Sequence, residues 1–300
     1  MPARQPITPQ LRGWIIAQAQ LGLSPPVVLQ AMIKAGWRHD SAVAAMEEVL
    51  ETHLHLPPGG GAVSHGALAH SDSEGSQPTP VGVTVPQLAI PQEAWRVDVA
   101  GHVVQVLAQL VAPRVVVLGN VFSADECQQL IAAARPRLKR SLTVQTNTGD
   151  EEMHVDRTSS GMFFERGESP LICRIEARIG QLLGWPVDHG EGLQILRYGP
   201  GAEYKPHYDY FDPAEPGTPK ILQRGGQRVA TLIVYLATPE AGGSTVFPDV
   251  GLEVAPQQGH AVFFNYPRAH PASLTLHGGT PVRIGEKWIA TKWLRERVFK

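Results

Sequence analysis

Residues 191–209 read Glu191-Gly-Leu-Gln-Ile-Leu-Arg-Tyr198-Gly-Pro-Gly-Ala-Glu-Tyr204-Lys-Pro-His207-Tyr-Asp209. The apolar run 193–198 predicts a buried β-strand, and the Gly-Pro-Gly that follows predicts a turn. If the chain beyond the turn is extended, His207 and Asp209 point to the same side, roughly 7 Å apart at their Cα atoms, so the two can share one metal ion. The stretch therefore predicts a strand-rich fold with a metal site just beyond a strand.

The His-x-Asp pair is a weak signal by itself, because the same pattern occurs at three places in the chain. His70-Ser-Asp72 lies in a linker-like segment, and His154-Val-Asp156 lies in a polar loop. Only His207-Tyr-Asp209 follows a predicted strand and has aromatic neighbours in the sequence. The alternative interpretation of His207 is an ordinary, half-buried histidine.

The second decisive segment reads His277-Gly-Gly-Thr-Pro-Val-Arg-Ile-Gly-Glu-Lys287-Trp-Ile-Ala-Thr-Lys-Trp293. His260, His270 and His277 are the candidates for a third metal ligand. His277 is preferred because it begins the segment that carries Lys287 within an otherwise apolar strand. A buried ammonium needs an anionic partner. The alternative is a strand-edge lysine that faces water.

Two histidines and one carboxylate are the donor set of an open-sided ferrous site. Lys287 lies ten positions past His277 and could hold the far carboxylate of a dicarboxylic cosubstrate. A zinc hydrolase with the same donors is a chemical alternative. It lacks an obvious general base in the sequence, and it would leave Lys287 without a role.

The composition excludes several classes of protein. Of the 300 residues, 43% are apolar and 18% are charged, enough to bury one large core or two medium ones. A net charge of −2 gives no electrostatic reason to expect binding to nucleic acid or to a membrane. Two cysteines, Cys127 and Cys173, cannot build a disulfide scaffold. We identify neither a signal peptide nor an apolar run of about 18 residues, and we therefore expect a cytoplasmic protein.

Three regions follow one another along the chain. Residues 1–56 carry apolar side chains at helical spacing and predict a module of about three short helices. Residues 57–92 are rich in Pro, Gly and Ser and predict a flexible linker, in which residues 81–90 could lie on a neighbour as an extended segment. Residues 93–300 form the main domain. The helical module is either a packed appendage or a binding site for a protein partner.

The main domain starts with helical patterns and continues with short strands. Residues 95–111 have helical periodicity, 115–118 predict a buried strand, and a capping box at Ser123–Glu126 leads into a helix that ends at residue 135. A second helix is predicted over 170–183. Further strands are predicted over 193–198, 229–236, 252–254, 261–265 and 287–294. This order predicts an α+β fold, in which a β-sandwich or barrel is buttressed by helices.

Residues 115–293 resemble, in order, the catalytic domain of the collagen-type prolyl 4-hydroxylases, which are 2-oxoglutarate- and Fe(II)-dependent dioxygenases. The resemblance rests on residues 157–163, 191–211, 225–236, 242–248 and 277–293. It implies a double-stranded β-helix, or jelly roll, that holds the metal in its mouth. It also implies Fe(II), 2-oxoglutarate as cosubstrate and ascorbate as reductant. The implied reaction hydroxylates prolyl residues in a peptide or protein and releases succinate and CO2.

The resemblance further implies a role for each matching residue of the metal and cosubstrate site. His207, Asp209 and His277 match the iron ligands. Lys287 matches the lysine that pairs with the distal carboxylate of 2-oxoglutarate. Two more residues, Tyr198 and Thr245, match positions that form hydrogen bonds to that carboxylate.

Four residues match positions on the substrate side of the site. Tyr204 and Arg228 match positions near the target proline and are expected to act in catalysis. Trp293 lines the same site, and Arg157 would lie beside a substrate loop.

Two loops, residues 142–156 and 215–224, depart from the family pattern. Loops at these places clamp the peptide in this family, so the choice of peptide stays open. A hydroxylase of a free amino acid or another small molecule is the main alternative. The remaining alternative is an interaction protein, in which the oxygenase domain serves only as a scaffold.

Overall fold

The structure is a computed structural model that describes residues 7, 9–20, 25–34, 37–54, 84–89, 94–140, 143–144, 151–152 and 158–300. The chain divides into two compact units, residues 1–80 and 81–300. Within the described ranges, each helix is too short or too polar to span a lipid bilayer.

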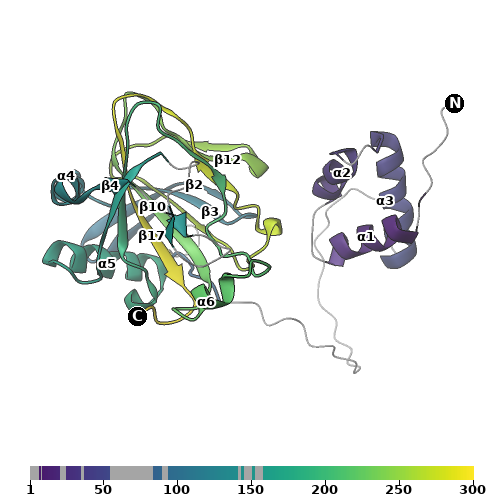
Figure 1. The fold of residues 1–300 in the computed structure, drawn as a ribbon, viewed down its shortest axis with the longest axis horizontal. Helices are drawn as coiled ribbons and strands as arrows, with labels where there is room; N and C mark the ends of the chain where they lie inside the picture. Colours follow the sequence, from purple (N-terminus) through teal and green to yellow (C-terminus); the bar gives the residue numbers. More distant parts are fainter. Residues whose placement is uncertain are drawn as a thin grey trace. The chain divides into compact units, whose positions relative to one another are not determined.

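The first unit contains three helices, α1 (Pro9–Gln20), α2 (Pro25–Lys34) and α3 (His39–Leu54) (Figure 1). Proline occupies the first position of α2, where its fixed φ suits a helix start and its missing N–H costs no hydrogen bond. The three helices share a small core of buried apolar side chains: Ile15, Val28, Met32, Ala42, Ala45, Met46 and Val49. The members from α3 are spaced three and four residues apart, so one face of that helix packs on the other two helices.

The second unit is built on a nine-stranded sheet, with the strand order β1-β2-β3-β14-β10-β17-β8-β7-β4. Its strands are β1 Arg96–Val99, β2 His102–Leu110, β3 Val115–Gly119, β4 Lys139–Arg140, β7 Ser160–Phe164, β8 Leu193–Tyr198, β10 Arg228–Ala237, β14 Ala261–Asn265 and β17 Lys287–Arg295. All pairs in this sheet are antiparallel. The predicted strands at 115–118, 193–198, 229–236, 261–265 and 287–294 are confirmed.

A four-stranded sheet of order β13-β12-β15-β9 accompanies the large one. Its strands are β9 Tyr204–His207, β12 Thr245–Phe247, β13 Leu252–Val254 and β15 His277–Gly279. Two further pairs join β11 (Ala241–Gly242) to β16 (Val282–Ile284) and β5 (Thr143–Val144) to β6 (Glu151–Glu152). One buried apolar cluster contains residues of both larger sheets, among them Tyr198, Tyr235, Phe247, Val254 and Phe264. The two sheets therefore share a core, which is the sandwich arrangement of a jelly roll.

The prediction of a helix over residues 95–111 is wrong. These residues form the hairpin of β1 and β2, in which Val99 pairs with His102 across a two-residue turn. Ala100 and Gly101 both have positive φ, of 55° and 78°, and the Asp98 carboxylate accepts a hydrogen bond from the Gly101 N–H at 2.7 Å. Turns of this kind fit the twist of a hairpin. The many valines of this stretch favour strands, and this preference outweighs a helical spacing of apolar residues.

Helices α4 (Ala124–Ala134) and α5 (Pro170–Leu183) cover one face of the large sheet (Figure 1). The predicted capping box is present, because the Ser123 side chain accepts from the Glu126 N–H and the Glu126 side chain accepts from the Ser123 N–H. Glu126 also forms a two-pronged ion pair with Arg178 of α5, at 2.7 and 2.9 Å. The caps and this ion pair fix both helices against the sheet.

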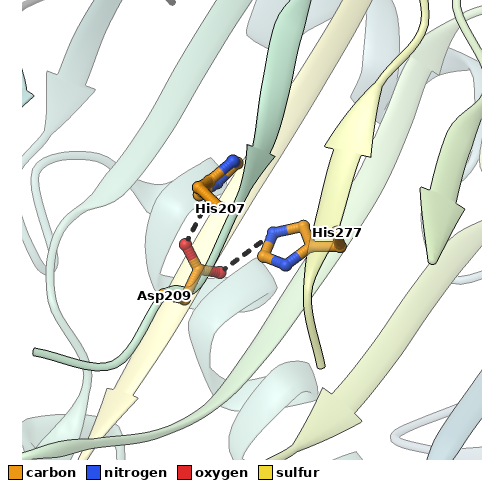
Figure 2. A group of neighbouring side chains, drawn as sticks. All are labelled: His207, Asp209 and His277. Atoms are coloured by element: carbon orange, nitrogen blue, oxygen red, sulfur yellow. Dashed lines mark ion pairs between the residues drawn. The ribbon is translucent and has the colours of Figure 1, made fainter. Parts of the chain in front are cut away.

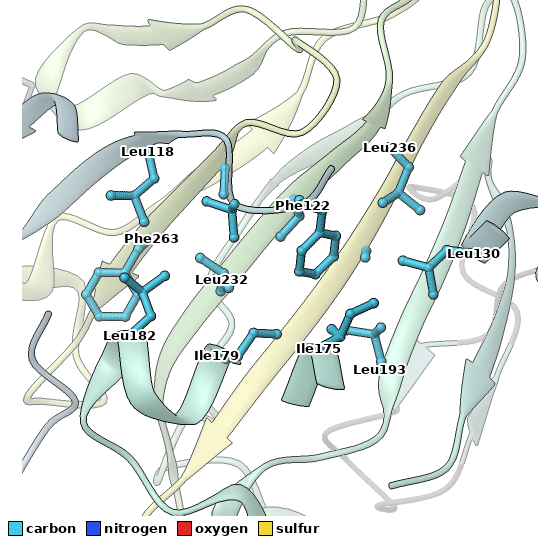
Figure 3. Close-up of a cluster of buried hydrophobic side chains, with 14 of the residues drawn as sticks. Leu118, Phe122, Leu130, Ile175, Ile179, Leu182, Leu193, Leu232, Leu236 and Phe263 are labelled. Atoms are coloured by element: carbon cyan, nitrogen blue, oxygen red, sulfur yellow. The ribbon is translucent and has the colours of Figure 1, made fainter. Parts of the chain in front are cut away.

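The core under these helices is the larger of the two apolar clusters in the second unit. In Figure 3, Ile175, Ile179 and Leu182 of α5 face Leu193 and Leu232 of the sheet. Residues 84–89 belong to the same layer, since Val85 and Leu88 pack on this core and the Ala89 N–H donates to the Leu182 carbonyl at 2.8 Å.

Short helical segments complete the second unit: α6 Thr218–Leu222 and the 3-10 turns Arg135–Arg137, Val187–His189, Pro248–Val250 and Pro271–Ser273.

The side chains of strand β17 show what lies on each face of the large sheet. Alternate residues Trp288, Ala290 and Leu294 belong to the helix-covered core. The intervening residues, Lys287, Ile289, Thr291 and Trp293, line a cavity between the two sheets. Because side chains alternate along a strand, one β17 sequence supplies both a core layer and a pocket wall.

Candidate metal centre and its surroundings

His207, Asp209 and His277 all line this cavity, and their side chains point toward one another (Figure 2). The two histidines are paired directly across β9 and β15, and Asp209 follows the end of β9 by two residues. One ligand atom from each residue lies within 4.8 Å of the other two. The spacing of His207 and Asp209 and the choice of His277 over the other histidines therefore agree with the sequence prediction.

Glycine allows the two histidine-bearing strands to come this close. A Cβ atom placed on Gly278 would lie 2.9 Å from the Tyr204 carbonyl oxygen and 3.0 Å from the Pro206 nitrogen. Real Cβ atoms essentially never approach so closely. The residue after His277 must therefore be glycine for β15 to hold its register on β9.

Backbone carbonyls set the orientation of both imidazoles. The Nδ1 atom of His207 donates to the Lys205 carbonyl at 2.8 Å, and Nδ1 of His277 donates to the Thr275 carbonyl at 3.0 Å. Because a carbonyl oxygen only accepts, each Nδ1 carries the proton, and each Nε2 presents a lone pair to the site.

The Asp209 carboxylate faces both Nε2 atoms. It lies 3.6 Å from Nε2 of His207 and 3.5 Å from Nε2 of His277, distances longer than an ordinary hydrogen bond. Its Oδ2 atom instead accepts a hydrogen bond from the Thr231 hydroxyl at 2.7 Å, and that hydroxyl lies 3.0 Å from the Tyr266 hydroxyl. The sequence analysis did not identify Thr231 or Tyr266, since neither belongs to a recognisable motif.

Burial and charge favour the protonation states that a metal site needs. Burial lowers the pKa of His277 to about 4, against the opposing effect of Asp209, so this imidazole is neutral at pH 7. Burial acts to raise the pKa of Asp209, but the two imidazoles and the Arg228 guanidinium hold it well below its usual range. A neutral imidazole at His277 and an ionised carboxylate at Asp209 are ready to bind a divalent ion.

Lys287 lines the same cavity and is only 4% exposed. In the described part of the chain, no carboxylate lies within ion-pair distance of its ammonium, which lies 5.7 and 5.8 Å from the ring centres of Tyr198 and Tyr235. Burial lowers the pKa of Lys287 to about 8. A buried ammonium without an anionic partner is costly unless a ligand supplies the anion.

The other cosubstrate candidates lie close to this lysine. Tyr198 pairs with Lys287 across β8 and β17, and both Tyr198 and Thr245 line the cavity. The Thr245 hydroxyl accepts a hydrogen bond from the Tyr235 hydroxyl at 2.8 Å, which fixes its orientation. Lys287, Tyr198 and Thr245 are thus brought together, as the sequence analysis expects.

The substrate-side candidates occupy two different positions. Tyr204 stacks on the His207 ring, with 3.7 Å between ring centres, and both Tyr204 and Trp293 line the cavity. The Arg228 side chain points elsewhere. It forms a two-pronged ion pair with Glu191 at 2.7 and 2.9 Å, and its guanidinium lies 3.9 Å from the centre of the Trp293 ring.

Arg157 and most of the loop 142–156 lie outside the described residues. Of the histidines that the sequence offered as alternatives, neither His260 nor His270 lines the cavity. The sequence analysis missed Glu191 and Arg295, whose ion pair at 2.9 Å joins the start of β8 to the end of β17. The available signal was Glu191, an acidic residue just before a predicted strand, but its partners Arg228 and Arg295 are distant in the sequence.

With this geometry established, comparison with known proteins identifies the family. The sequence model of the 2OG-Fe(II) oxygenase superfamily matches residues 193–295. Over 209 residues the chain is 41% identical to a protein named probable prolyl 4-hydroxylase 3 from Arabidopsis thaliana, a match that covers 63% of this chain and 71% of that relative. The chain belongs to the prolyl 4-hydroxylase family.

Other members of the prolyl 4-hydroxylase family match over the same share of the chain. Prolyl 4-hydroxylase 1 from Arabidopsis thaliana is 42% identical over 205 residues, which is 62% of this chain and 70% of that protein. Among solved structures, the 2-oxoglutarate complex of the viral collagen prolyl hydroxylase vCPH from Paramecium Bursaria Chlorella virus-1 covers 60% of this chain and 95% of its own. It is 32% identical, with a TM-score of 0.46.

As a member of this family, the chain is a 2-oxoglutarate-dependent dioxygenase that uses Fe(II). The predictions of family, jelly-roll fold and enzyme class are confirmed. The donor set fits the cofactor, because two imidazoles and one carboxylate on one side of an ion are the ligands of non-haem ferrous oxygenases.

Proposed function

We propose that this enzyme hydroxylates prolyl residues in a peptide or protein, with Fe(II) bound by His207, Asp209 and His277. One observation carries the proposal: three metal donors line the same cavity as a buried ammonium that has no carboxylate partner among the described residues. When bound, Fe(II) would activate O2, the oxidant of the reaction: one oxygen atom would enter the succinate formed from 2-oxoglutarate with release of CO2, and the other would enter the C–H bond of the substrate.

In this proposal the protein orients its ligands before they bind. The Lys205 and Thr275 carbonyls hold the two imidazole rings, and Thr231 holds one oxygen of Asp209. Groups that are already oriented lose little freedom on binding, so the geometry of the site is fixed by the fold.

Lys287 binds the distal carboxylate of 2-oxoglutarate, and Tyr198 and Thr245 form hydrogen bonds to it. The support is the placement of a single buried cation in the cavity wall, because a charge-assisted hydrogen bond in such surroundings is strong and directional. With one end fixed there and the other at the triad, the cosubstrate can take only one orientation.

Tyr204 and Trp293 contact the target proline from the wall of the cavity that holds the metal donors. Their rings line the cavity, and the buried indole N–H of Trp293 has no acceptor within the described residues. A peptide carbonyl would satisfy that donor. The guanidinium of Arg228 packs on the Trp293 ring and holds the indole in position. Arg157 contacts the substrate loop. Ascorbate serves as the reductant.

The first test measures succinate formed from 2-oxoglutarate with Fe(II) and ascorbate, with and without a Pro-Gly repeat or poly-proline peptide. We expect the peptide to stimulate turnover and to gain 16 mass units. His207→Ala should lower turnover by more than about 100-fold, because even the groups that only orient metal ligands contribute about 10- to 100-fold each. His270→Ala, which changes a histidine outside the cavity, serves as the matched control.

Two results would contradict the proposal in different ways. Turnover that needs His207 but ignores every peptide would keep the oxygenase and favour a free amino acid or another small molecule. Full turnover of His207→Ala would show that the metal ligands are assigned wrongly.

A further inference from the structure

A second cavity lies next to the one that holds the triad, and the proposed reaction does not use it. Trp293 lines the triad cavity, while its ring packs against Arg228 and Phe163, which line the second cavity. The guanidinium of Arg228 lies 3.9 Å from the centre of the indole, and the ring centres of Phe163 and Trp293 are 6.5 Å apart. A chain whose proline enters the first cavity therefore passes close to the second.

The charges on the walls of this second cavity are mostly positive. Five basic side chains line it: Arg166, Lys220, Arg224, Arg228 and Arg295. Two carboxylates, Glu165 and Glu191, line it as well. The protein as a whole is slightly acidic, with a net charge of −2, so this local excess of cations is a property of the site and not of the composition.

Two arginines that line the cavity share one carboxylate. Glu191 accepts from Arg228 at 2.7 and 2.9 Å and from Arg295 at 2.9 Å. Arg295 is only 2% exposed, and its Nε has no acceptor within the described residues. Glu191 is shared by both guanidinium groups, and Asp209 acts on Arg228 from the side of the triad. The charge of the fully buried Arg295 is therefore balanced only by a shared carboxylate, and an approaching anion would stabilise it further.

Arg166 adds a cation that no carboxylate of the described residues neutralises. Its guanidinium donates only to backbone carbonyls, those of Asp188 and Gly190, and no carboxylate of the described residues lies within ion-pair distance. Backbone carbonyls hold the side chain in place but leave its charge available to a ligand.

Aromatic rings form the apolar part of the walls. Phe211 lies under the guanidinium groups of Arg228 and Arg295, at 4.7 and 5.1 Å, and Phe299 lies 4.1 Å from that of Arg224. Phe163 is 44% exposed. Rings that support guanidinium groups keep them in position, and their remaining surface can contact the methylene groups of a bound side chain.

We propose that this second cavity binds an acidic side chain of the substrate polypeptide, so that the enzyme prefers prolines that have a glutamate or aspartate nearby in the sequence. The inference rests on the proposed function, because it needs a peptide in the neighbouring cavity. Both parts of an acidic side chain find a partner in this cavity. Its carboxylate would pair with the guanidinium groups, and its methylene groups would contact the phenyl rings.

The test uses a set of peptides that each contain one proline and one glutamate, with the glutamate moved over three positions on either side. Matched peptides carry glutamine instead. At low ionic strength we expect kcat/KM for the best glutamate peptide to exceed that of its glutamine partner by about 10-fold, mainly through KM. The ratio should fall towards one as salt is added.

Arg166→Glu tests whether the cavity causes the preference. We expect it to abolish or invert the glutamate-to-glutamine ratio, while Arg166→Lys retains much of it. Arg174→Glu is the matched control, because Arg174 lies exposed on α5 and its guanidinium donates to the Pro170 carbonyl, away from both cavities. Each variant is judged by the ratio between the two peptides, so a general loss of activity cancels.

Binding of a fluorescent glutamate peptide, followed by anisotropy, separates this inference from the proposed function. If prolines are hydroxylated but glutamate and glutamine peptides behave alike, the inference is wrong and the function stands. If no peptide is hydroxylated, the function fails. The cavity assignment then survives only if the glutamate peptide still binds more tightly than its glutamine partner and Arg166→Glu removes the difference.

Discussion

Strand β17 carries a buried lysine on each of its two faces, and only one of them has a carboxylate partner among the described residues. Lys292 points to the helix-covered face, is 2% exposed, and pairs with Glu176 of α5 at 2.6 Å. Lys287 points to the cavity face, is 4% exposed, and has no carboxylate within ion-pair distance among the described residues. Five positions apart on one strand, the two lysines must lie on opposite faces.

The difference separates a charge that the fold balances from a charge that it leaves for a ligand. Removing one partner of a buried ion pair is strongly destabilising, so the contact between Lys292 and Glu176 holds α5 to the sheet. The ammonium of Lys287 contributes nothing comparable to the fold. Burial lowers its pKa to about 8, so the site stabilises the charged form less than water does, and a bound anion would oppose this effect.

The largest expected effects come from replacing each lysine by methionine. Lys287→Met should raise the KM for 2-oxoglutarate by about 100-fold or more, because it leaves the distal carboxylate without its cation. Without cosubstrate, the same variant should be more stable than the wild type by roughly 1–3 kcal/mol at pH 7, since the cost of burying the ammonium disappears. Urea denaturation and steady-state kinetics measure the two effects.

Lys292→Met should do the reverse. We expect it to lose about 3–5 kcal/mol of stability, because Glu176 would be left buried without its cation. Its KM for 2-oxoglutarate should change little, and adding Glu176→Gln should recover much of the lost stability. If Lys287→Met proved as destabilising as Lys292→Met, the contrast between the two faces would be wrong.

Thr231→Val tests whether residues on the cavity face of the sheet orient the metal ligand Asp209. The variant removes the hydroxyl that holds Oδ2 of Asp209, so metal affinity should fall by about 10- to 100-fold. Mn(II) binding followed by electron paramagnetic resonance measures this without any turnover. Thr291→Val is the matched control, since Thr291 lines the same cavity but has no hydrogen bond to the triad. Equal losses of metal affinity in both variants would contradict a specific role of Thr231 in orienting Asp209.

The pH dependence of cosubstrate binding should report Lys287 directly. The pKa of Lys287 in the free protein is about 8, below its ordinary value of 10.5. Below about pH 8 the ammonium is charged and binds the carboxylate, and above it the neutral amine does not. The KM for 2-oxoglutarate should therefore be flat well below pH 8, about double at pH 8, and reach about 10-fold its low-pH value one unit above. Lys287→Arg keeps its charge and should flatten this rise, whereas a rise that persists would come from another group.

The smallest effect is expected on the helix-covered face. Ser123→Ala removes the side-chain cap of α4 and should lower the free energy of unfolding by about 1 kcal/mol, with kcat and the KM for 2-oxoglutarate unchanged. A change in either kinetic constant would mean that the two faces of the sheet are more strongly coupled than their separate cores suggest.

The sequence predicted best where one short segment carries both the element and its chemistry. Leu193–Tyr198 and Lys287–Leu294 are apolar runs with turns beside them, and His207, Asp209 and His277 lie beside or within such strands. The capping box at Ser123 is also a local signal, and the structure contains it. In each case the determining contacts lie within a few residues, where periodicity and turn chemistry can be recognised.

Prediction failed where local patterns competed or where contacts are distant. In residues 95–111, a helical spacing of apolar residues coincided with a high content of valine, and the valines together with the turn at Ala100 and Gly101 favour the hairpin. The ion pairs of Glu191 join residues 37 and 104 positions apart. No periodicity reports such a pairing, because it arises from the order of strands in the sheet.

The placement of the triad also bears on how the domain holds together. His207 and His277 belong to β9 and β15, short strands of the smaller sheet, and Asp209 is tied through Thr231 to β10 of the larger one. An ion bound by all three is a reversible cross-link, which fastens one sheet to the other and closes the long loop between Asp209 and His277. Cross-links of this kind act partly by restricting the unfolded chain. Amide protons of the smaller sheet should then exchange more slowly in the metal-bound enzyme. The metal ion would thus stabilise the fold in addition to taking part in the reaction.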